Sequence, residues 1–204
     1  MSNKPLPPLD VTRKTGAETF CDGSHPLSFN VLDFWQWSAS DLVSNALRGR
    51  VAEFLVAQAL DVANGVRAEW DAYDLRTRTG ETVEVKSAAY LQTWIQRDLS
   101  KIQFDIAPTR SWSAETNVYA SEVKRQADIY VFALLGHQDK STLNPLDVSQ
   151  WSFFVLRGDV LNNQLGPQKQ ISLSTLKRLL PIQCRFDQLA EAIATASARF
   201  GADT

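Results

Sequence analysis

The longest regular pattern in the chain is a set of apolar residues spaced three and four apart between residues 41 and 62. That spacing places them on one face of an amphipathic α-helix, which the Asn-Gly pair at 64–65 would end. Ser38, three residues before Asp41, has the position of a helix N-cap. Glu53 lies at the edge of the apolar face, so its side chain either faces solvent or reaches over a neighbouring sheet.

After this helix the pattern changes to alternation. Residues 68–78 and 81–89 alternate between apolar and polar around a Thr-Gly pair, which predicts a β-hairpin. Residues 127–135 are almost continuously apolar, as in a strand covered on both faces. Further strands are expected at 152–156 and, shorter, at 104–107, with a short extended segment at 171–173 and helices at 174–180 and 186–200. This order predicts an α/β fold with a central mixed β-sheet flanked by α-helices.

The N-terminal stretch has no such pattern. Residues 1–30 are polar and rich in Pro, and they predict an irregular arm. The aromatic segment 30–37 is expected to pack where the first helix begins. The rest of the chain, residues 31–204, is expected to form a single domain whose core region spans 42–135.

Composition agrees with a soluble globular protein. The 204 residues are 44% hydrophobic and 22% charged, and six Trp and ten Phe supply bulky core side chains. The formal net charge of -2 disfavours an extended phosphate-binding surface, because nucleic-acid affinity comes largely from Lys and Arg. A bound divalent cation would change that balance locally.

Several classes of protein are excluded by what the sequence lacks. Two His and two widely separated Cys are too few for sites built on several His or Cys ligands, and no glycine-rich phosphate-binding motif is present. No run of 18 apolar residues predicts a membrane span. The Cys residues are expected to be free thiols in a reducing compartment, so a cytoplasmic location is expected.

The sharpest chemical signal is the triplet Glu84-Val85-Lys86. Side chains alternate along a strand, so Glu84 and Lys86 project from one face. Centring the hairpin on residues 79–80 places Asp74 almost opposite Glu84. Asp71 is the alternative partner, but the same register places it opposite Ser87 or Ala88, beyond Glu84.

Two carboxylates this close repel unless one is protonated or a cation lies between them. A divalent metal is the simplest resolution, and Mg²⁺ needs only two or three carboxylates. Glu53, from the preceding helix, would complete the metal site. Lys86 would orient the attacking water or stabilise developing negative charge.

The same triplet has a simpler interpretation. Glu-x-Lys on a strand is commonly an exposed, salt-bridged face with no catalytic role. An Asp at the right offset and a helical Glu upstream favour the functional interpretation, as does the buried strand that follows the charged hairpin.

The succession LRGRVAEFLVAQAL, AYDLRTRTGETVEVKSAAY and QADIYVFALL resembles the PD-(D/E)XK, or restriction-endonuclease-like, nuclease superfamily. Asp74, Glu84 and Lys86 match its motif and Glu53 matches its frequent helical Glu, although Tyr73 stands where the motif has Pro. The resemblance implies a restriction-endonuclease-like core, Mg²⁺ that Mn²⁺ could replace, and hydrolysis of DNA phosphodiester bonds.

Further expectations concern the surroundings of this site. Val85 is included among the metal-binding positions. Ser87, Lys101, Gln103 and Arg125 are candidate substrate contacts, with a helix expected at the segment that holds Lys101 and Gln103. DNA is the expected partner, and a homodimer through the aromatic N-terminal arm is a hypothesis. The alternatives are a non-catalytic nucleic-acid-binding or protein-interaction module that keeps the fold, or an unrelated enzyme in which Glu84 and Lys86 form a chance salt bridge.

Overall fold

A computed structural model of the chain describes residues 9–67, 72–110, 112–113 and 118–198. They divide into two compact units, one built from residues up to 40 with 64–67, the other from 41–63 with the chain after 67. No described helix has the length and apolar character that crossing a membrane requires.

The first unit contains a hairpin and a helix. Strands β1 (Thr19–Asp22) and β2 (His25–Asn30) pair antiparallel, and α1 (Val31–Ala39) follows directly. Asn30 caps α1 by accepting from the Asp33 amide, while the Asp33 carboxylate accepts from the Asn30 amide. Part of the stretch expected to be irregular is therefore a hairpin. The predicted N-cap Ser38 lies instead in the last turn of α1, where it donates to the Phe34 carbonyl.

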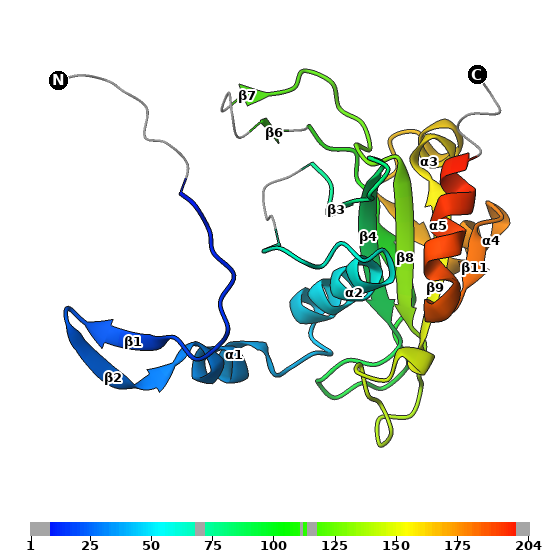
Figure 1. Cartoon of the computed structure of the whole chain (residues 1–204). Coiled ribbons are helices and arrows are strands. Elements are labelled where there is room, and N and C mark those ends of the chain that lie inside the picture. The colour runs from blue at the N-terminus through cyan, green and yellow to red at the C-terminus, as the bar shows by residue number, and fades with distance from the viewer. Residues whose placement is uncertain (1–8, 68–71, 111, 114–117, 199–204) are drawn as a thin grey trace. The chain divides into compact units, whose positions relative to one another are not determined.

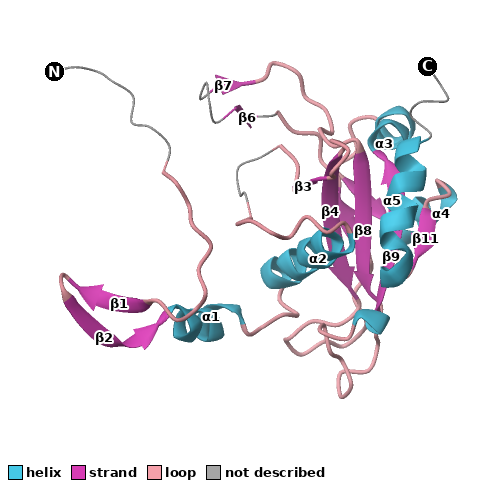
Figure 2. Ribbon diagram, in the orientation of Figure 1, coloured by secondary structure: helices cyan, strands magenta, loops and turns pink. Residues whose placement is uncertain are grey.

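The second unit is built around a five-stranded sheet (Figures 1 and 2). Its strands are β3 (Leu75–Arg76), β4 (Thr82–Ala89), β8 (Ile129–Leu135), β9 (Trp151–Arg157) and β11 (Ile182–Cys184). Two smaller pairs join β5 (Gln103–Asp105) to β10 (Gln170–Ser172) and β6 (Trp112–Ser113) to β7 (Val118–Tyr119). The helices are α2 (Asn45–Ala59), α3 (Gly158–Leu165), α4 (Leu173–Arg178) and α5 (Leu189–Ala198), with 3₁₀ turns η1 (Val148–Gln150) and η2 (Phe186–Gln188).

The sheet order is β11-β9-β8-β4-β3, and only the β4–β8 pair is parallel. The predicted mixed sheet flanked by helices is confirmed. Strand β8 lies at its centre, and all seven of its residues are buried, as its continuous apolar sequence predicts.

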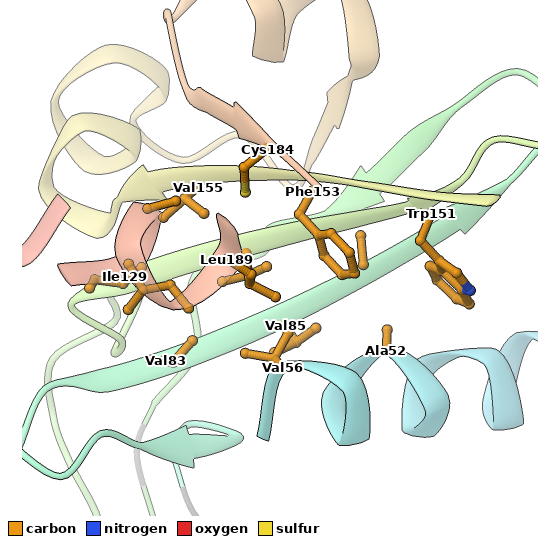
Figure 3. Close-up of a cluster of buried hydrophobic side chains, with 14 of the residues drawn as sticks. Ala52, Val56, Val83, Val85, Ile129, Trp151, Phe153, Val155, Cys184 and Leu189 are labelled. Atoms are coloured by element: carbon orange, nitrogen blue, oxygen red, sulfur yellow. The ribbon is translucent and has the colours of Figure 1, made fainter. Parts of the chain in front are cut away.

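One face of the sheet packs against α2 and α5. Ala52 and Val56 of α2 contact Val83 and Val85 of β4 in a buried cluster, and α5 contributes Leu189 and other apolar residues (Figure 3). The opposite face is covered by the β5–β10 pair together with α3 and α4. The two faces of β4 therefore differ: the side chains of Val83 and Val85 point to α2, and those of Glu84 and Lys86 to the other side.

Some elements differ from those predicted. The predicted long helix begins at Asn45 because α1 and a turn occupy the residues before it. Strand β5 overlaps the short strand predicted at 104–107, and the helix expected at the segment that holds Lys101 and Gln103 is not formed. Helix α3 and strand β11 have no counterpart among the predicted elements. These segments are short, and their structure depends on packing against the sheet rather than on their own periodicity.

Gly158, at the junction of β9 and α3, has no room for a side chain. Its amide donates to the Asp128 carbonyl at 2.8 Å, and an added Cβ would meet the Ala127 carbonyl oxygen at 2.2 Å. We expect Gly158→Ala to lower the free energy of unfolding by roughly 2–3 kcal/mol, because backbone must move. Chemical denaturation measures this. Gly65→Ala, where an added Cβ meets nothing within 4 Å, is the control and should change stability little; equal losses in both variants would contradict the steric explanation.

Candidate active site

The candidate site is built on the β3–β4 hairpin. Leu75 pairs with Val83 and Arg76 with Thr82, so Asp74 lies opposite Glu84, as the sequence predicts. The Thr-Gly turn closes the hairpin, with Gly80 at φ 107°. Asp71, the alternative to Asp74, lies outside the described residues.

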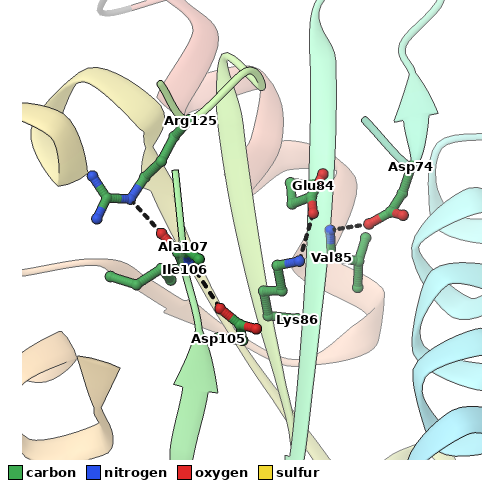
Figure 4. Close-up of polar contacts among 8 residues, drawn as sticks. All are labelled: Asp74, Glu84, Val85, Lys86, Asp105, Ile106, Ala107 and Arg125. Atoms are coloured by element: carbon green, nitrogen blue, oxygen red, sulfur yellow. Dashed lines mark hydrogen bonds and ion pairs between the residues drawn. The ribbon is translucent and has the colours of Figure 1, made fainter. Parts of the chain in front are cut away.

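Asp74 is held against the backbone of β4. Its carboxylate accepts a hydrogen bond from the Val85 amide at 2.7 Å (Figure 4). Burial and the negative charge of Glu84 raise the pKa of Asp74 to about 7, although the Val85 hydrogen bond opposes the rise. The charge of Glu53 contributes to the rise, so the helical Glu lies within electrostatic range of Asp74. Repulsion between Asp74 and Glu84 is thus present in this structure.

This raised pKa predicts a pH dependence of stability. In the unfolded chain the Asp74 carboxyl ionises near pH 4. Protonation therefore favours the folded state, and the contribution is complete below that pH and lost as pH rises to about 7. Without divalent metal, Asp74→Asn should be more stable than wild type above pH 7 by roughly 1–3 kcal/mol, with the difference vanishing near pH 4. Urea denaturation at several pH values measures it, and a difference independent of pH would contradict the assignment.

Glu84 and Lys86 lie on the face of β4 opposite α2. The Lys86 ammonium donates to the Glu84 carboxylate at 2.5 Å. Burial alone would lower the pKa of Lys86, but Glu84, with Asp74 and Asp105, raises it above its usual value. Lys86 therefore keeps its proton at neutral pH and acts as a cation and hydrogen-bond donor.

Both side chains line a pocket of about 100 Å³. The remaining lining residues come from the start of the hairpin, the segment at and after β5, and the approach to β8: Ala72, Asp105, Ile106, Ala107, Thr109, Gln126 and Tyr130. Figure 4 shows the Lys86 side chain on the side of β4 that faces Asp105. Hence Lys86 and Glu84 are accessible from a recess rather than from a flat surface.

Glu53 reaches the site from a different element. It follows Ala52 on α2, whose side chain is fully buried against β4, and is itself half-buried. Within the residues that the structure describes, no group of three His, Cys, Asp or Glu side chains is already arranged as a metal site. Asp74 and Glu84 are the paired carboxylates, with Glu53 near enough to act on Asp74 electrostatically.

Val85 has no ligating side chain, so it could contribute only its backbone carbonyl. The Val83 carbonyl accepts from the Asp74 amide at 3.1 Å, which shows that Val83 turns its backbone polar groups toward β3. Strand geometry repeats every two residues, so the Val85 carbonyl points the same way. The carbonyl and the Asp74 carboxylate therefore share one edge of β4.

The four candidate substrate contacts are placed differently. Ser87 lies on the α2 side of β4, where its hydroxyl approaches Gly49, whereas Glu84 and Lys86 point the other way. Lys101 is exposed in the loop before β5. Gln103 is exposed on β5, on the same face of the strand as Asp105.

Arg125 is buried, and its guanidinium forms hydrogen bonds to backbone carbonyls. Its guanidinium donates to the carbonyls of Ile106 at 2.8 Å, Gly166 at 2.9 Å and Gln168 at 2.7 Å. These contacts join the end of β5 to the loop after α3. Arg125 therefore has a structural role and is not part of the candidate site.

Two residues of the pocket were missed by sequence reasoning. Tyr130 pairs with Glu84 in the parallel register of β4 and β8, and burial together with the charge of Glu84 raises its pKa. Its hydroxyl is the one polar side-chain group in an otherwise apolar strand, and this pattern in the sequence could have indicated a site residue. Asp105 alternates with buried Phe104 and Ile106, a pattern too short to distinguish a site residue from an exposed strand residue.

Comparison with known proteins adds the family. A comparison with curated proteins found no match. The family model for bacteriophage T4 endonuclease IV matches residues 30–175, which include Glu53, Asp74, Glu84 and Lys86 and leave out nearly all of the β1–β2 hairpin. The match covers more than two thirds of the 204 residues, so the chain belongs to the bacteriophage T4 endonuclease IV family, a family of nucleases.

Proposed function

We propose that this protein is a Mg²⁺-dependent endonuclease that hydrolyses phosphodiester bonds in DNA at the β3–β4 hairpin. The observation that carries the proposal is the pairing of two carboxylates, Asp74 and Glu84, next to a protonated Lys86. The endonuclease family supports the reaction class and DNA as substrate. The order of helix, hairpin and buried strand supports a site of the PD-(D/E)XK type.

The donors fit a hard divalent cation. Mg²⁺ prefers carboxylate and carbonyl oxygens and keeps several waters, so Asp74, Glu84 and the Val85 carbonyl would suffice, with Glu53 acting directly or through water. The raised pKa of Asp74 reflects burial and, after it, the negative charge of Glu84, and a bound cation would offset that charge. When bound, the metal lowers the pKa of a water molecule and neutralises charge on the phosphate. Mn²⁺, with similar ligand preferences, would substitute.

Lys86 has the role of a charge stabiliser. Because Glu84 helps to hold the proton on Lys86, the ammonium is unsuited to accept a proton from water. It would instead donate a hydrogen bond to a non-bridging phosphate oxygen or orient the attacking water. The water attacks phosphorus in line and releases its proton to solvent. The bond to the leaving oxygen breaks, and that oxygen takes a proton from solvent.

The test combines activity with a binding readout. Closed circular, linear duplex and single-stranded DNA would be incubated with Mg²⁺, Mn²⁺ or a chelator, and we expect metal-dependent cleavage that includes the closed circle. Separately, Mg²⁺ or Mn²⁺ should raise the melting temperature of wild type. The rise should be larger at pH 8 than at pH 6, because at pH 6 the metal must compete with the proton on Asp74.

The outcomes separate the alternatives. If metal stabilises the protein but none of these DNAs is cleaved, the metal site is supported and the substrate is a DNA other than those tested. If the metal neither stabilises the protein nor supports cleavage, the proposal is overturned in favour of a non-catalytic binding module. Metal-dependent cleavage that persists in Asp74→Asn would place the chemistry elsewhere.

A further inference from the structure

The first unit exposes an apolar surface that its own residues do not cover. Of the residues described in this unit, only Gly16 is buried. On the hairpin, the Phe20 and Phe29 rings contact at 5.1 Å, and Leu27, two residues before Phe29, lies on the same face. All three side chains are exposed. A two-stranded hairpin of this kind is marginally stable unless its apolar face is packed against something.

Helix α1 extends the surface. Its only strongly polar positions are Asp33 and Gln36, which neighbour each other around the helix, and no residue of α1 is buried. Gly16 lies against Leu32 and Trp35, since an added Cβ would meet them at 3.2–3.4 Å. The rest of the apolar arc remains open, and Trp37 is 85% exposed. We call the exposed side chains of both elements the aromatic surface: Phe20, Leu27, Phe29, Leu32, Phe34, Trp35 and Trp37.

The size of this surface suits a stable protein interface. With about 200 Å² for a fully accessible large side chain, its seven residues expose roughly 700 Å². A standard interface takes about 800 Å² from each partner. An exposed apolar patch of this size marks an interaction site rather than ordinary surface.

Its charge argues against nucleic acid or an anionic membrane. The described part of the unit carries four acidic residues (Asp10, Glu18, Asp22, Asp33) and three basic ones (Arg13, Lys14, Arg67). Stacking platforms for single-stranded nucleic acid and anionic lipid surfaces both require a basic groove or patch beside the aromatic rings. A near-neutral, apolar surface is instead typical of the interface between two copies of one chain, which needs no complementary charge.

The family match covers only the α1 part of this surface. The match begins at residue 30, so the hairpin half of the aromatic surface precedes it. We propose that the aromatic surface is the interface of a homodimer, in which the β1–β2 hairpin and α1 of one copy pack against the same elements of a second copy. The two hairpins supply a two-fold, self-complementary contact, with Trp37 and Phe34 as central anchors.

The test is the oligomeric state of the full chain without DNA or metal, so that it is independent of the nuclease activity. Sedimentation velocity over about 1–50 µM should show a dimer for wild type. The Phe34→Asp/Trp37→Asp double variant should weaken dimerisation at least about 100-fold, because it places two carboxylates in an apolar contact. Ile95→Asp, at an apolar residue that is 96% exposed in the second unit, is the matched control and should dimerise as wild type does.

Folding of the variants would be checked by circular dichroism. If the double variant unfolds, Trp37→Ala replaces it, since a side chain this exposed contributes little to the unit's own fold. A wild-type monomer throughout the concentration range would overturn the proposal, as would a double variant that dimerises as tightly as wild type. Monomeric wild type that loses DNA binding on Trp37→Ala would assign the aromatic surface to nucleic acid instead.

Discussion

Asp74→Asn is expected to reduce metal-dependent DNA cleavage by about 1,000-fold or more. Lys86→Ala is expected to reduce it by roughly 100–1,000-fold. Asp74→Asn keeps an oxygen that accepts from the Val85 amide but removes the carboxylate that would hold the metal. Lys86→Ala removes the cation next to Glu84. Initial rates of cleavage at saturating Mg²⁺ measure both effects.

The controls separate chemistry from folding and binding. Asp61→Asn removes an exposed carboxylate that pairs with Arg78 on the surface, and it should cleave as wild type does. DNA binding in the presence of a chelator should not weaken in Asp74→Asn, because a negative charge has been removed. If Asp74→Asn or Lys86→Ala retains more than about a tenth of the wild-type rate, the residue does not have the role proposed for it.

The second large effect concerns stability. Arg125→Met should lower the free energy of unfolding by roughly 3–5 kcal/mol, because it removes the buried donor from the acceptors of the guanidinium. These acceptors are the carbonyls of Ile106, Leu161, Gly166 and Gln168 and the side-chain oxygen of Asn162. Met keeps much of the side-chain volume, so the loss reports hydrogen bonding rather than a cavity. Chemical denaturation measures the change.

Arg178→Met is the matched control for this prediction. Arg178 lies in the last turn of α4, is exposed, and donates to the Thr175 hydroxyl, so its replacement should cost less than about 1 kcal/mol. A small loss in Arg125→Met would mean that water replaces the guanidinium, and the join between β5 and the loop after α3 would then not depend on it.

Much of the candidate site could be predicted from sequence because its geometry is local. A strand repeats every two residues and a Thr-Gly turn sets the hairpin register, so the placement of Asp74 opposite Glu84 followed from counting. The buried strand β8 was equally clear, since a seven-residue run that is apolar except for the Tyr130 hydroxyl has no other stable location in such a sheet. The amphipathic period of α2 placed Glu53 at the edge of its apolar face.

Other features depended on contacts between residues far apart in the chain. The structural role of Arg125 depends on hydrogen-bond acceptors 19 to 43 positions away in the chain, and no local sequence pattern predicts them. Asp105 and Tyr130 join the pocket only because β5 packs over the face of β4 and β8 pairs with it in parallel. The β1–β2 hairpin gave no periodic signal in a Pro-rich stretch. The sequence by itself therefore determined the hairpin, the buried strand and the acidic pair with Lys86, because these follow from short-range geometry. Only the tertiary structure decided which distant side chains surround them, because packing and long-range hydrogen bonds set those neighbours.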